Sequence, residues 1–120
     1  MRRFPGIAVV AACLMMFVSC GSNDVGPTGH LVGARCTSDK DCSKRCLLGA
    51  GFPGGYCSQT CATEKDCPGG TACVKNDDVS GACIATCHVP GDCDGYGTGY
   101  QCNRLPRQEG GEGALVCTGA

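Results

Sequence analysis

The chain has 120 residues with a formal net charge of -1, and it contains 14 Cys, 20 Gly, 6 Pro and no Trp. Cysteine makes up about 12 per cent of the chain, above the roughly 8 to 10 per cent that marks a short secreted protein cross-linked by disulfides. Large apolar side chains are few between Cys36 and Cys117, so their burial alone cannot offset the entropy of ordering the backbone. The composition therefore excludes a fold built on a large apolar core and argues against a large buried active site.

The first 19 residues are typical of a lipoprotein signal peptide. A basic start precedes twelve apolar residues at positions 7–18, too few to span a bilayer, which needs about 20. They fit the apolar core of a secretory signal, which is usually about 7 to 15 residues long. The run ends in Phe17-Val-Ser-Cys20-Gly21, which resembles a bacterial lipobox.

The lipobox resemblance implies that Cys20 becomes the first residue of the mature protein and carries a lipid. The acyl chains of that lipid would anchor the protein to a membrane. Gly21, rather than Asp, follows the cysteine, which by the same resemblance favours the outer membrane of a Gram-negative bacterium. With Cys13 removed and Cys20 lipidated, twelve cysteines remain, an even number that can pair completely. Ordinary signal cleavage near the same place is the alternative interpretation.

The mature chain is mildly acidic. Removal of residues 1–19 takes away two Arg and leaves eight basic against eleven acidic residues, a net charge of about -3. No basic stripe remains to gather phosphates along a nucleic acid, so we expect no nucleic-acid partner.

The segment that follows, residues 20–35, is predicted to be the lipidated cysteine and a flexible tether. Between Gly21 and Arg35 it has four Gly, one Pro and no cysteine, and its apolar residues show no clear period. A flexible segment of this length would give an end-to-end distance of roughly 20 Å.

Three four-cysteine units follow, covering residues 36–60, 61–86 and 87–117, with 118–120 as a tail. Five residues separate the first two cysteines of every unit, and an Asp stands immediately before each second cysteine. Three residues separate successive units both times, so the pattern indicates an internal repeat. The cysteines are Cys36, Cys42, Cys46, Cys57, Cys61, Cys67, Cys73, Cys83, Cys87, Cys93, Cys102 and Cys117.

The predicted fold is small and disulfide-rich, with short strands and turns and little helix outside the signal peptide, because Gly and Pro interrupt the chain too often for long helices. Residues 55–58 and 82–85 are predicted strands. Four cysteines permit three pairings within a unit. The interlaced pairing, first to third and second to fourth, is favoured because it is the most compact; it gives Cys36–Cys46, Cys42–Cys57 and their equivalents.

The repeated Asp41, Asp66 and Asp92 are predicted to accept hydrogen bonds from nearby backbone amides and to stabilise turns. The alternative role for such aspartates is a calcium site formed by Asp39, Asp41, Asp92 and Asp94, but no terminal Glu completes such a ligand set. The cysteine spacings do not form paired zinc knuckles. We therefore expect neither a metal nor a cofactor.

Two segments, Asp66-Cys-Pro-Gly-Gly-Thr-Ala-Cys73 and Gly55-Tyr-Cys-Ser-Gln-Thr-Cys61, together resemble the Dickkopf N-terminal-like cysteine-rich repeats of bacterial lipoproteins. Granulin, whey-acidic-protein and epidermal-growth-factor-like modules have partly similar cysteine spacings and small residues. The resemblance covers residues 36–117 and implies a disulfide-stapled module of the kind linked with protein interactions. Unit three departs from it, because fourteen residues separate Cys102 from Cys117.

Catalysis is not expected. The mature chain has two histidines, His30 and His88, and no Gly-x-Ser-x-Gly motif. An oxidising compartment would also convert the regularly spaced thiols into disulfides.

A non-catalytic binding or structural module at the cell envelope is the leading functional prediction, with the membrane as one partner and an envelope protein or glycan as another. The predicted partner contacts are Leu47, Leu48, Phe52 and Tyr56, which would form an exposed apolar loop or, alternatively, the small core. Tyr96 and Tyr100 are predicted either to stack on a sugar or to cover disulfides.

A disulfide-scaffold protease inhibitor is the alternative function. Its candidate basic loops are Lys44-Arg45, which lies in a tight three-residue interval, and 104–107, which lies in a Gly-rich loop expected to be floppy. A plain spacer is the third possibility.

Overall fold

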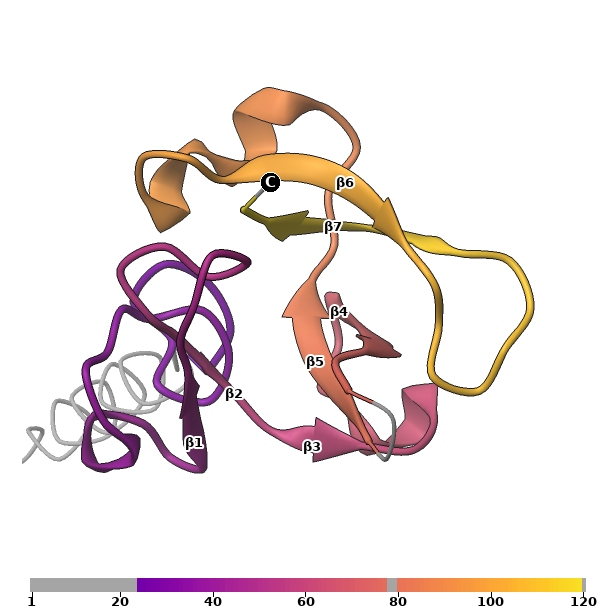
Figure 1. Cartoon of the computed structure of the whole chain (residues 1–120), viewed down its shortest axis with the longest axis horizontal. Coiled ribbons are helices and arrows are strands. Elements are labelled where there is room, and N and C mark those ends of the chain that lie inside the picture. Colours follow the sequence, from indigo (N-terminus) through magenta and orange to yellow (C-terminus); the bar gives the residue numbers. More distant parts are fainter. Residues whose placement is uncertain (1–23, 78–79, 120) are drawn as a thin grey trace, which may run out of the picture.

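The computed structural model describes residues 24–77 and 80–119, so the predicted signal peptide, residues 1–19, and Cys20 lie outside the described residues. In the described part no helix is both long enough and apolar enough to cross a membrane. The described part of the chain consists of short strands and short 3₁₀ helices (Figure 1). The elements are η1 (Asp39–Asp41), β1 (Arg45–Leu47), β2 (Tyr56–Ser58), β3 (Thr60–Cys61), η2 (Glu64–Asp66), β4 (Thr71–Lys75), β5 (Gly81–Ala85), η3 (Pro90–Tyr96), β6 (Gln101–Leu105) and β7 (Ala114–Thr118).

Each unit contributes one antiparallel hairpin: β1 with β2, β4 with β5, and β6 with β7, while β3 joins the free edge of β5. The third and fourth cysteines of each unit face each other across the hairpin, as Cys46 faces Cys57. The predicted strands at 55–58 and 82–85 are confirmed by β2 and β5. The small disulfide-rich fold of short strands is therefore the observed one.

The disulfide pairing is the interlaced one in all three units. Although the third and fourth cysteines are cross-strand neighbours, each bonds instead to a cysteine of the preceding turn. The sulfur atoms of the first, second and fourth cysteines then lie within 4.8 Å of one another in every unit. The six bonds are Cys36–Cys46, Cys42–Cys57, Cys61–Cys73, Cys67–Cys83, Cys87–Cys102 and Cys93–Cys117.

At two positions another part of the chain lies so close to the backbone that only glycine fits. A Cβ on Gly55, where φ is +84°, would overlap the carbonyl oxygen of Cys36. A Cβ on Gly81 would lie 2.8 Å from the Val74 carbonyl oxygen and 2.9 Å from the Cys73 sulfur. Both glycines therefore let a strand pass directly against the disulfide-bonded backbone.

The prediction of a flexible tether is wrong for residues 24–35. Val32 is completely buried in the core, and Ala34 packs with Cys36 and Cys57. The backbone pairs with unit one, since the Gly33 amide donates to the Cys57 carbonyl at 2.8 Å and the Cys57 amide donates to the Ala34 carbonyl at 2.8 Å. Tertiary hydrogen bonds thus order a stretch whose composition alone is that of a linker.

The Gly-rich loop between β6 and β7 is likewise docked rather than floppy. Residues 106–108 lie along the free edge of β4: the Lys75 amide donates to the Pro106 carbonyl at 2.9 Å, and the Gln108 amide donates to the Cys73 carbonyl at 3.1 Å. The Arg107 guanidinium adds an ion pair to Glu64 at 2.7 Å. The long interval of unit three therefore extends the sheet of unit two.

Candidate functional site

The three recurrent aspartates have the local role predicted for them. Asp66 Oδ2 accepts the amides of Ala62 at 2.8 Å and Thr63 at 3.1 Å, and Asp41 and Asp92 accept the equivalent two amides of their own units. These backbone donors hold the pKa of all three carboxyls below the usual value of 3.8. The carboxylates therefore act as turn acceptors.

A cluster of aromatic rings joins unit one to unit three. The ring of Tyr56 is surrounded by Phe52 and Tyr96, each with its centroid 5.6 Å away, and by Tyr100 at 6.0 Å. The Tyr56 hydroxyl accepts the amide of Ala85 in β5 at 3.0 Å, so this one side chain contacts all three units. Burial raises the pKa of Tyr56 well above its ordinary value, and that of Tyr100 to about 12.

The four predicted contact residues differ in their exposure to solvent. Leu47 and Tyr56 are buried in the core, as the alternative interpretation of this segment predicted, so neither is open to direct contact with a partner. Phe52 is half-buried and lines a crevice of about 280 Å³ together with Leu105. Leu48 is 62% exposed and is the member of the set that is presented to solvent. Tyr96 and Tyr100 are buried too, so they are not open sugar-stacking platforms.

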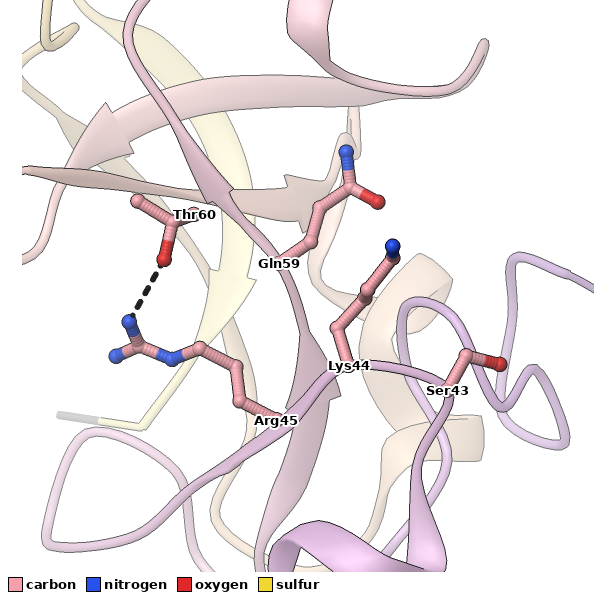
Figure 2. A pocket seen from close by; sticks show the side chains of 5 residues that line it. All are labelled: Ser43, Lys44, Arg45, Gln59 and Thr60. Atoms are coloured by element: carbon pink, nitrogen blue, oxygen red, sulfur yellow. Dashed lines mark hydrogen bonds between the residues drawn. The ribbon is translucent and has the colours of Figure 1, made fainter.

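A surface hollow of about 510 Å³ lies where unit one leads into unit two (Figure 2). All three residues between Cys42 and Cys46 line it, together with two of the three residues between Cys57 and Cys61. Figure 2 shows Arg45 extending toward Thr60, whose hydroxyl oxygen accepts from Nη1 at 3.0 Å. The lining residues are Ser43, Lys44, Arg45, Gln59 and Thr60.

The hollow carries two positive charges and no carboxylate in its lining. Among residues 24–77 and 80–119, neither Lys44 nor Arg45 has an acidic partner within ion-pair distance. The carboxylates of the nearby turns accept backbone amides instead: Asp39 Oδ1 accepts the Cys46 amide at 2.8 Å, and Asp66 accepts its own turn amides. The hollow therefore has hydrogen-bond donors and two positive charges that form no ion pair with a described residue.

The other basic loop proposed for protease inhibition is tied to the molecule. Arg104 donates to the Gly113 carbonyl at 3.0 Å, and Arg107 donates to the Glu112 carbonyl at 2.9 Å in addition to its ion pair with Glu64. Lys44 and Arg45 lie at the hollow. The structure thus holds Arg104 and Arg107 by intramolecular bonds rather than extending them toward a protease.

The histidines and acidic residues form no shared site in the described part of the chain. His30 Nδ1 lies 3.2 Å from the Asp41 carbonyl oxygen, while the His88 backbone amide donates to Asp92. The clusters with metal-ligand spacing among the described residues are cysteine triads, one per unit. All their sulfurs are already in disulfides, which leaves no thiolate ligand in them.

Comparison of the chain with models of known protein families, with curated proteins and with solved structures finds no match. The resemblance to Dickkopf N-terminal-like repeats therefore rests on the motif residues of units one and two. Of the residues that line the hollow, the sequence singled out Lys44 and Arg45 as basic residues but missed Ser43, Gln59 and Thr60. The signal that could have found them is that the intervals from Cys42 to Cys46 and from Cys57 to Cys61 each contain three residues and are each flanked by disulfide-bonded cysteines.

Proposed function

We propose that this protein is an exported lipoprotein, anchored at the cell envelope through a lipid on Cys20, whose three units act as a non-catalytic binding module. The observation that carries the proposal is the completeness of the disulfide framework. All twelve cysteines of the repeat region are paired, and such a framework persists in oxidising compartments outside the cytosol. The lipobox-like motif at Cys20 supplies the anchor, and Gly21 favours the outer membrane.

The arrangement of the units supports a binding module. Backbone hydrogen bonds join unit one to unit two, as the Cys83 amide donates to the Gln59 carbonyl at 3.1 Å. An isolated antiparallel bridge between Thr86 and Val116 joins the end of unit two to β7 of unit three. A cross-linked body of this kind presents the hollow and Leu48 at little further cost in conformational entropy on binding. Kinship with Dickkopf-like repeats forms part of the proposal.

The test is the intact mass of the protein extracted from membranes, before and after reduction and thiol alkylation. The proposal predicts a chain that begins at Cys20, carries a lipid and exposes twelve alkylatable thiols only after reduction. Cys20→Ala should abolish the lipid and release the protein from membranes, whereas Cys13→Ala, inside the removed segment, should change neither. An unlipidated mass, or free thiols before reduction, would refute the proposal.

A further inference from the structure

The hollow at the first junction is positioned by covalent bonds on both sides. Ser43, Lys44 and Arg45 occupy one short interval between bonded cysteines, and Gln59 and Thr60 belong to the other. The strands hold the two intervals in register, because Arg45 pairs with Ser58 while Thr60 pairs with Ala82. The backbone under the hollow is therefore preorganised, which lowers the entropy lost when a ligand binds.

The chemistry of the lining suits an oxyanion. The hydrogen bond to Thr60 uses one guanidinium N–H of Arg45, which leaves its other donors free, and Lys44 adds three ammonium donors. Arg and Lys are the side chains that bind phosphate most readily, through the guanidinium fork and the ammonium point charge. The hydroxyls of Ser43 and Thr60 can add further hydrogen bonds to the same group.

The folded body also begins close to the proposed lipid. Asp24 lies four residues after Cys20, and four residues span at most about 14 Å in any conformation. Residues 24–35 pack on unit one, and the Ser43 amide donates to the His30 carbonyl at 2.8 Å. The rim of the hollow thus contacts the segment that leads directly to the anchor.

From this geometry we infer that the hollow formed by Ser43, Lys44, Arg45, Gln59 and Thr60 binds a phosphate group, supplied by a lipid headgroup at the membrane surface. The source of the phosphate rests on the proposed function, because the lipid on Cys20 is what brings headgroups within reach. The binding chemistry itself depends on the hollow alone. The two parts can therefore be tested separately.

The test follows backbone amide shifts of the full mature protein by NMR in a phosphate-free, non-ionic detergent. One arm titrates inorganic phosphate, and a second adds phosphatidylglycerol to the micelles; chloride at equal ionic strength is the control for salt. We expect saturable shifts at residues 43–45 and 59–60 in both phosphate arms, with binding to phosphatidylglycerol the tighter of the two. Chloride should leave these amides in place.

Two double variants that remove the same charge make the test specific. Lys44→Gln with Arg45→Gln should weaken phosphate binding by at least about tenfold, as expected for the loss of hydrogen bonds to charged groups. Lys40→Gln with Lys65→Gln removes two exposed lysines outside the hollow and should leave binding unchanged. Unchanged amide shifts in the hairpins of units two and three verify that each variant is folded.

Each other outcome overturns a defined part of the inference. Equal effects of the two double variants, or shifts spread over all basic residues, would mean non-specific ion binding and would refute the site. Binding of inorganic phosphate without binding of phosphatidylglycerol would refute the headgroup as its source. A protein shown by its mass to lack the lipid, yet still binding phosphate in the hollow, would refute the proposed anchoring while leaving the hollow's chemistry intact.

Discussion

The turns before the second cysteines and the two cysteine-free stretches, 24–35 and 106–113, become ordered by different means. In the turn of unit two, the Asp66 carboxylate accepts amides three and four residues earlier in the chain. In contrast, the partner of Gly33 is Cys57, and the partner of Gln108 is Cys73. The turns are held by partners only a few residues away. The cysteine-free stretches combine such local bonds, for example from the Val32 amide to the Asp24 carbonyl, with bonds to the disulfide-bonded units.

The largest effect on stability is expected from removing a disulfide, and its size should depend on the length of the loop that the bond closes. Removing the bond Cys93–Cys117 by changing both residues to Ala should destabilise the protein by about 2 to 5 kcal/mol. It closes 24 residues, whereas Cys36–Cys46 closes 10, and the chain-entropy model makes the longer loop worth about 0.8 kcal/mol more. Chemical denaturation of both double variants measures the difference. A larger loss from the shorter loop would show that strain or packing outweighs loop entropy.

The Tyr56 hydroxyl is the next most important contact between units. Tyr56→Phe leaves the buried Ala85 amide without its acceptor and should cost about 1 to 3 kcal/mol. Tyr100→Phe is the matched control, because the buried Tyr100 hydroxyl has no hydrogen-bond partner within the described residues. Its removal should be neutral or slightly stabilising. Equal losses from both variants in a denaturation experiment would contradict the role given to Tyr56.

The docking of residues 24–35 is tested by Val32→Ala. Val32 is fully buried, and removing two of its carbons should cost about 1.5 kcal/mol. Val89→Ala, at a position that is 55% exposed, should change stability by less than about 0.5 kcal/mol. Thermal unfolding distinguishes the two variants. A Val32 variant as stable as the Val89 variant would restore the interpretation of this segment as a tether.

The loss of stability at acidic pH tests the contribution of the three Asp-stabilised turns. The pKa values of Asp41, Asp66 and Asp92 are lowered in the folded protein by backbone donors. Their contribution to stability is therefore complete above the unfolded value near 4 and is lost as the pH falls through the lower folded values. The thermal midpoint should drop in that window, and changing all three to Asn should flatten the drop. An unchanged pH dependence in the triple variant would assign the acid limb to other carboxylates.

How far the fold could be predicted follows from the same contrast. Compactness within one unit favoured the interlaced pairing among the three that four cysteines permit, and the Asp before each second cysteine predicted its turn. Both features depend on neighbours within one unit. The burial of Val32 was not predicted, and that of Tyr56 was predicted only as the alternative to partner contact. Both depend on residues distant in the chain that no local pattern specifies. The long interval of unit three looked flexible for the same reason: its partner, the edge of β4, lies about thirty residues earlier in the chain.

For the candidate site, the sequence separately provides two basic residues and a three-residue connector. Only the pairing of β1 with β2 and of β3 with β5 places Lys44 and Arg45 beside Gln59 and Thr60. The predicted apolar contacts shared this limit. Leu47 and Leu48 are adjacent in sequence, yet Leu47 ends β1 and is buried in the core, whereas Leu48 follows the strand and is exposed.

The most direct test of the central claim, that three disulfide-bonded units and two cysteine-free stretches form one ordered body, is amide hydrogen exchange of the mature protein resolved by residue. The account predicts slow exchange at Val32, Gly33 and Gln108, comparable with that of the hairpin amides, because these groups donate to backbone carbonyls within the folded body. Exchange at the rate of an unstructured chain in residues 24–35 or 106–108, beside protected hairpins, would contradict it.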